Sequence, residues 1–89
     1  VEIIYPTIKL NGEAGEVAEK VGKVLRDNAG VFTDEIKKEI AKEIGDVMWY
    51  CAALAKDLGY TLEQIVEMNL DKLASRNARN VINGSGDNR

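Results

Sequence analysis

Apolar residues recur at helical spacing along almost the whole chain, and this pattern predicts an all-α fold. In three segments every third or fourth residue is apolar, as on one face of an α-helix. We expect helices over about residues 7–26, 33–58 and 61–78, because runs of turn-forming residues interrupt the pattern between them. No segment shows the alternating pattern of a β-strand, and Pro6 is the only proline. The predicted architecture is an antiparallel bundle of three helices.

Local signals indicate where two of these helices begin. Thr33 is a typical N-cap residue, since its hydroxyl can accept a hydrogen bond from the first turn. Thr61 and Gln64 have the spacing of a capping box. The last ten residues are rich in Gly and Asn, so we expect one helical domain over residues 1–79 and a polar tail over residues 80–89.

Length and composition restrict the class of protein. A chain of 89 residues and 9.8 kDa allows one domain with a thin core. The net charge of −3 argues against a general nucleic-acid binder, and no run of about 20 apolar residues could span a membrane. The absence of a signal-peptide pattern favours a cytoplasmic location. There is no His, and the single Cys51 lies among apolar residues, which favours a core thiol over a nucleophile.

Two pairs of acidic residues, Glu13/Glu16 and Glu43/Asp46, are notable for their position. Their spacing alone proves nothing, because 15 acidic residues among 89 give roughly two or three such pairs by chance. On a helical wheel, however, Glu43 lies about 20° from Ile36, inside the apolar face. A bare carboxylate is costly to bury unless a partner neutralises it. With no His and few basic residues nearby, a bound metal cation is the expected partner.

Antiparallel packing of the first two helices would bring these four carboxylates to one seam. Oxygen ligands suit Mg²⁺, or alternatively Mn²⁺, whereas the lack of His argues against a di-iron bundle. On the third segment Asn69, Lys72 and Arg76 share one edge and could face the seam, which would suit a polyphosphate substrate. The alternative is a solvated face carrying ordinary cations. Tyr50, beside the acidic edge, is a candidate for stacking on a nucleobase.

The residues around these positions carry a family resemblance. Three segments resemble the MazG-like nucleotide pyrophosphohydrolases of the all-α NTP pyrophosphatase superfamily. Their sequence words are G-E-A-G-E-V-A-E-K (12–20), K-E-I-G-D-V-M-W-Y (42–50) and N-L-D-K-L-A-S-R (69–76). The E-x-x-E and E-x-x-D pairs, separated by 26 residues, agree with that family's pattern. The resemblance implies Mg²⁺-dependent hydrolysis of a nucleoside triphosphate between the α and β phosphates. It also implies metal ligands (Glu13, Glu16, Glu43, Asp46) and phosphate-binding residues (Lys72, Arg76, Asn69).

The beginning of the chain departs from the family pattern. Members usually have another helix before the G-E-A-G-E segment, and residues 1–6 read like the end of something longer. We therefore expect that an N-terminal helix, and part of the nucleotide pocket, is missing.

Two alternative functions remain open. Within the enzyme class, a narrower relative would act on dCTP, dUTP or phosphoribosyl-ATP. From another class, a non-catalytic helical oligomerisation or regulatory module would explain the periodicity. Such a module would not explain Glu43 in the apolar face, nor the three matching words.

The second helix is also apolar on its far side, through Met48, Trp49, Ala52 and Ala53. A helix that is apolar nearly all round is buried on two sides. Because so short a chain has little else to cover the second side, we predict a homodimer, which could pair into a tetramer. Trp49 would anchor its interface.

Overall fold

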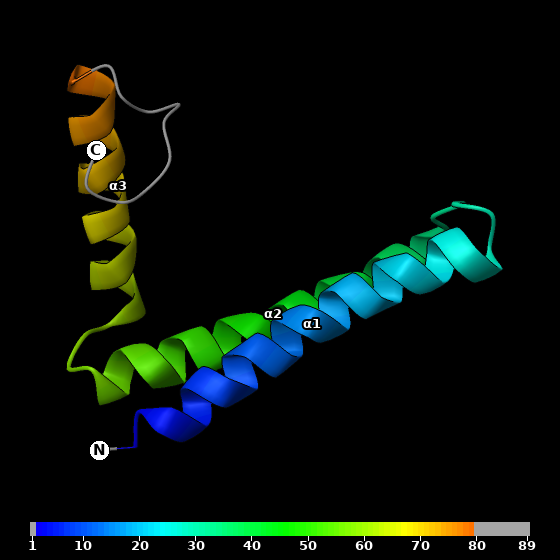
Figure 1. The fold of residues 1–89 in the computed structure, drawn as a ribbon, viewed down its shortest axis with the longest axis horizontal. Coiled ribbons are helices and arrows are strands. Elements are labelled where there is room, and N and C mark those ends of the chain that lie inside the picture. Colours follow the sequence, from blue (N-terminus) through cyan, green and yellow to red (C-terminus); the bar gives the residue numbers. More distant parts are fainter. Residues whose placement is uncertain (1, 80–89) are drawn as a thin grey trace.

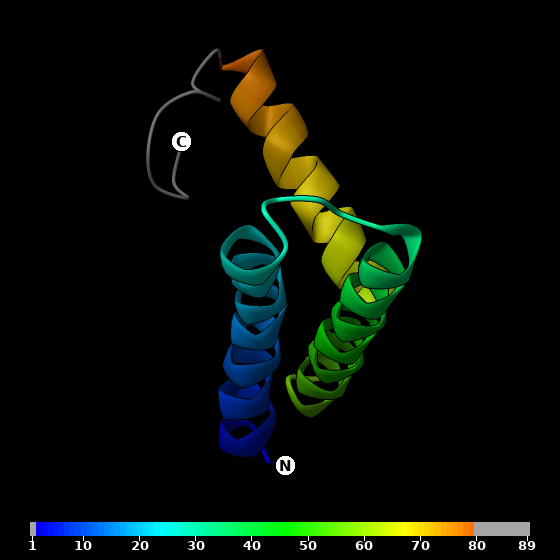
Figure 2. The same cartoon turned by 90° about the vertical axis from the view of Figure 1, so that its right-hand side faces the viewer.

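The structure is a computed structural model that describes residues 2–79, and it contains three α-helices: α1 (Ile4–Asp27), α2 (Asp34–Asp57) and α3 (Leu62–Ala78). Figure 1 shows α1 and α2 running antiparallel, side by side, as a long hairpin. α3 leaves the end of α2 and rises away from the hairpin, as Figure 2 also shows. No strand occurs in this described range, so the predicted all-α fold is confirmed. The predicted polar tail lies outside the described residues.

Helix α1 begins three residues earlier than the sequence pattern indicates. The carboxylate of Glu2 accepts hydrogen bonds from the backbone N–H groups of Ile4 (3.1 Å) and Tyr5 (3.2 Å). Pro6 fits the first turn because a backbone N–H has no helical partner there and the fixed φ of proline suits the helix. The second half of the segment that we expected to precede the helix, residues 4–6, is therefore its first turn.

The connection between α1 and α2 follows from local chemistry. After Asp27 the chain turns through a left-handed conformation at Gly30 (φ 75°), whose N–H donates to the Val24 carbonyl at 3.0 Å. Glycine tolerates this φ without a steric penalty. The Thr33 hydroxyl oxygen then accepts from the Ile36 N–H at 3.2 Å, so the predicted N-cap is confirmed.

The connection between α2 and α3 is equally local. α2 ends at Asp57, and Gly59 takes up a positive φ of 89°. The Thr61 backbone N–H donates to the Gln64 side chain at 2.8 Å, while the Gln64 N–H donates to the Thr61 hydroxyl at 3.1 Å. This reciprocal pair is the predicted capping box, and it satisfies two backbone groups that a helix start leaves without partners.

The seam between α1 and α2 forms a thin core. Only Pro6, Val24 and Ala55 are buried among the described residues. Two helices alone cover only the strip along their line of contact, so residues at the edges of each apolar face, such as Leu25 and Ile44, stay exposed. An open apolar groove of about 350 Å³ also remains near the loop end of the hairpin, where Val24 is one of the lining residues.

α3 does not close the hairpin into a compact bundle. It packs against α2 but makes no close backbone approach to α1. Its apolar residues Val66 (51% exposed) and Leu70 (59% exposed) therefore remain accessible to solvent. In the described part of the chain, no helix combines the length and the apolar character needed to cross a membrane.

Candidate metal centre

Two glutamates occupy positions in the seam of the hairpin where the helical pattern otherwise places apolar residues. On α2, Glu43 lies between the half-buried residues Ile40 and Val47, at the spacing of three to four that keeps side chains on one helix face. On α1, Glu13 takes the corresponding place one turn before Val17. The predicted position of Glu43 inside the apolar face is thus confirmed.

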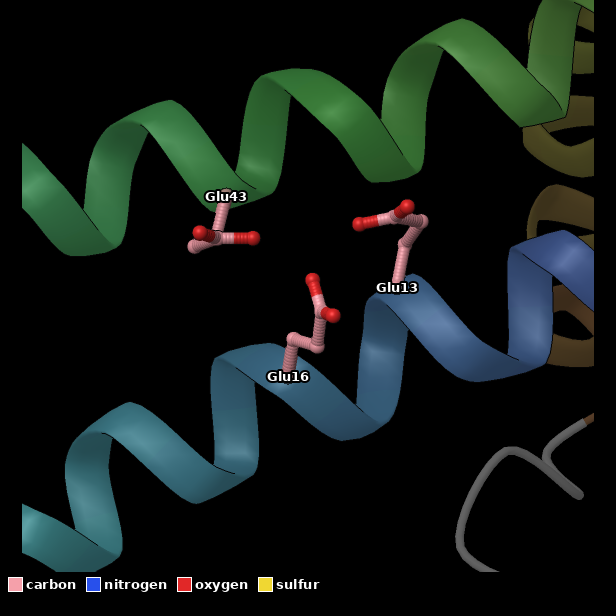
Figure 3. A group of neighbouring side chains, drawn as sticks. All are labelled: Glu13, Glu16 and Glu43. Atoms are coloured by element: carbon pink, nitrogen blue, oxygen red, sulfur yellow. The ribbon is translucent and has the colours of Figure 1, made fainter.

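Three carboxylates meet at this point of the seam. Figure 3 shows Glu13 and Glu16 reaching from α1, and Glu43 from α2, into the space between the helices. One carboxylate oxygen from each of them lies within 4.8 Å of the other two. We call these three residues the acidic cluster. Beside it lies a polar depression of about 210 Å³, with Glu16, Lys20 and Glu43 among its lining residues.

Two oxygens of the acidic cluster lack partners within the described structure. Oε2 of Glu13 and Oε2 of Glu43 are shielded from solvent and accept no hydrogen bond there. Only 18% of the Glu43 side chain is exposed. Shielded carboxylate oxygens are unfavourable without a donor or a cation, so this cluster fits a hard divalent cation such as Mg²⁺ or Mn²⁺.

The electrostatics of Glu43 reflect this crowding. Burial raises the pKa of its carboxyl above the ordinary value of 4.5, and a hydrogen bond with Glu16 and the negative charge of Glu16 raise it further. Lys20 acts in the opposite direction and Asp46 in the same one, both more weakly. Carboxylates this close resist being ionised together. A bound cation would remove that conflict.

The structure places the fourth predicted ligand, Asp46, outside the acidic cluster. Its side chain is exposed, although its charge is near enough to raise the pKa of Glu43. It follows Glu43 by three residues, which corresponds to about 60° around the helix, so it lies at the rim of the seam. The structure therefore brings together three of the four predicted carboxylates.

The predicted phosphate-binding residues are not brought to the acidic cluster by one chain. Asn69, Lys72 and Arg76 lie on α3, which has no close approach to α1, the helix that supplies two of the three clustered glutamates. Asn69 and Lys72 instead line a separate depression of about 310 Å³ on α3. The expectation that α3 faces the acidic seam is not met within the hairpin.

Two lysines of α1 flank the cluster, one turn before Glu13 and one turn after Glu16, and neither is among the site residues predicted from the sequence. Lys20 forms an ion pair with Glu43, with 3.7 Å between Nζ and Oε1. The ammonium of Lys9 lies 5.8 Å from the centre of the ring of Tyr50, the predicted stacking residue, which is half-buried. Lys9 and Lys20 are eleven residues apart, close to three helical turns, so they share one edge of α1. This spacing in the sequence could have indicated that both lysines lie beside the acidic residues of α1.

Comparison with known proteins settles the family. The model of the MazG nucleotide pyrophosphohydrolase domain matches residues 7–81. The chain belongs to this MazG family. The "Gene 37 protein" of Mycobacterium phage L5 is 54% identical over 85 residues, which is 96% of this chain and 75% of the relative. No solved structure gives a significant match to the chain.

Family membership agrees with the site. The matched region contains the whole acidic cluster, both flanking lysines and the candidate residues of α3. The three sequence words that suggested a MazG-like protein all lie within it. The predicted family is confirmed, and with it the broad class of a nucleotide pyrophosphohydrolase domain.

Proposed function

We propose that this MazG-family protein hydrolyses nucleoside triphosphates between the α and β phosphates, with Mg²⁺ as cofactor, and releases a nucleoside monophosphate and pyrophosphate. The observation that carries the proposal is the acidic cluster: two glutamates in an apolar seam, each with a shielded and unpartnered oxygen, face a third glutamate. A helical module without a metal would leave these oxygens unsatisfied.

Glu13, Glu16 and Glu43 would hold the cation, and Asp46 would join them from the rim of the seam. Mn²⁺ would satisfy the same oxygen ligands. Bound Mg²⁺ would neutralise charge on the triphosphate and lower the pKa of the attacking water. A carboxylate of this set that is not holding the cation can accept the proton that the water loses.

The candidate phosphate-binding residues are Lys72 and Arg76, with Asn69 beside them. α3 stands away from the acidic cluster in a single chain, so either a movement of α3 or a second copy must bring this basic edge to the substrate. Tyr50 would stack on the nucleobase. In that case the Lys9 ammonium, which lies over the Tyr50 ring, would be close to the bound nucleotide.

A second copy is also favoured by the apolar outer face of α2. Met48 and Trp49, which belong to this face, are 55% and 68% exposed in the single chain. Removing such a surface from water stabilises an assembly at about 25 cal/mol per Å². We propose that the protein is a homodimer, which can pair into a tetramer, and that it acts in the cytoplasm.

The proposal is tested by product analysis. The purified protein is incubated with a panel of ribo- and deoxyribonucleoside triphosphates and with phosphoribosyl-ATP, each with and without Mg²⁺, and pyrophosphate is measured separately from phosphate. We expect equimolar monophosphate and pyrophosphate, only with the metal. Turnover restricted to dCTP, dUTP or phosphoribosyl-ATP would identify the narrower enzyme. No turnover of any nucleotide would favour the non-catalytic module.

A further inference from the structure

Lys20 forms the interhelical ion pair of the acidic cluster. Its ammonium nitrogen lies 3.7 Å from Oε1 of Glu43, and the two side chains are 37% and 18% exposed. The other ion pairs recorded for the described residues, Arg26 with Asp27 and Lys42 with Glu39, join exposed neighbours on one stretch of chain. Lys20 therefore lies where a cation in the cluster would also be attracted.

The ammonium and a metal ion would compete for the same carboxylate. Lys20 contacts one oxygen of Glu43, while the other oxygen is shielded and without a hydrogen bond in the described structure. Lys20 and Glu43 also line the same polar depression, together with Glu16. Two cations held this close would repel each other, because little water separates them. The long lysine side chain can, however, swing its ammonium outward to solvent.

We propose that Lys20 is a resident counter-ion of the metal centre: it neutralises Glu43 while the protein is metal-free, and it must leave Glu43 when the metal binds. It stabilises the empty site and at the same time weakens the affinity for the metal. This inference rests on the proposed function, because it assumes that a metal binds the acidic cluster. It goes further by assigning a role to Lys20, which is not a metal ligand.

The test removes the charge and measures metal binding directly. Lys20→Met keeps the aliphatic stem but has no ammonium, Lys20→Gln is a second neutral variant, and Lys20→Arg keeps the charge. Lys23→Met is the matched control, because Lys23 is exposed and lines the same polar depression, but has no ion pair among those of the described residues. For each protein, Mg²⁺ and Mn²⁺ affinities are measured by calorimetry, and the melting temperature is measured in EDTA.

We expect both neutral Lys20 variants to bind the metal about 1.5- to fivefold more tightly than wild type, the range that a partly exposed ion pair is worth. They should also melt at a lower temperature in EDTA than Lys23→Met. Lys20→Arg should resemble wild type in both measurements. Structural damage alone would weaken metal binding, so a tighter Kd distinguishes competition from a packing role.

Two results would overturn the inference, and they have different meanings. If wild type binds the metal and the neutral variants bind no more tightly, Lys20 is not a competitor and the proposed metal centre stands. If no variant and no wild-type protein binds a divalent cation, the proposed metal centre fails and the role of Lys20 fails with it. A neutral variant that melts no lower than Lys23→Met in EDTA would also contradict the stabilising role.

Discussion

The substitution Trp49→Glu tests whether the open face of α2 is an interface. Trp49 is 68% exposed in the single chain. A tryptophan presents up to about 250 Å² of surface, so about 170 Å² remains in water. At about 25 cal/mol per Å², complete burial of that surface would contribute about 4 kcal/mol per copy, and burial of half of it about 2 kcal/mol.

A two-fold dimer contains this contact twice. Even with half of the surface covered, losing both indoles would cost about 4 kcal/mol, which corresponds to a dimer Kd about a thousandfold weaker. A buried carboxylate adds a further penalty. We therefore expect Trp49→Glu to be monomeric or unfolded at micromolar concentration. Its activity should fall as well, because the same helix carries Glu43.

The assay is light scattering coupled to size-exclusion chromatography, together with turnover of the nucleotide. Val31→Glu is the control: Val31 is 57% exposed, but it lies in the connection between α1 and α2 and not on the outer face of α2. It should keep the dimer mass and the activity. Native mass and full activity in Trp49→Glu would refute the reasoning and place the interface elsewhere.

Two further predictions concern the acidic cluster. The raised pKa of Glu43 means that the folded state holds its proton more tightly than the unfolded state, so this stabilisation is complete below pH 4.5 and is lost as the pH rises through the folded-state pKa. In EDTA, Glu43→Gln should lack this loss, so its melting temperature relative to wild type should rise between about pH 4 and about pH 8, and a constant difference would contradict the assignment. Millimolar Mg²⁺ should raise the melting temperature of wild type through preferential binding to the folded state, and should raise that of Glu43→Gln much less; no shift in wild type would favour the structural module.

The local parts of the fold could be predicted from the sequence because their causes are local. The Thr33 N-cap and the capping box of Thr61 and Gln64 depend on residues three apart, and both were confirmed. The inward position of Glu43 follows from helical geometry alone. The predicted start of α1 was wrong because the side chain of Glu2, which lies outside the periodic apolar pattern, accepts hydrogen bonds from the first turn.

The parts that could not be predicted depend on contacts between helices. The direction of α3 depends on its limited contact with α2. The apolar pattern of α3 predicts a helix but does not predict this direction. The pairing of Lys20 with Glu43 depends on how far α1 slides along α2, which neither helix specifies by itself. Asp46 has the expected spacing, but it lies about 60° from Glu43 around α2, which leaves it at the rim of the seam. The substrate and the assembly stay predictions.

The central claim is that the acidic cluster holds the metal needed for pyrophosphohydrolysis. It is tested most directly by comparing the rate of Mg²⁺-dependent pyrophosphate release by wild type, Glu43→Gln and Glu19→Gln. Glu19 is an exposed glutamate of α1 that lines the same polar depression but does not belong to the cluster, so its variant controls for the loss of one negative charge beside the site. We predict that Glu43→Gln remains folded and loses activity, while Glu19→Gln keeps it. Wild-type turnover by Glu43→Gln would contradict the account.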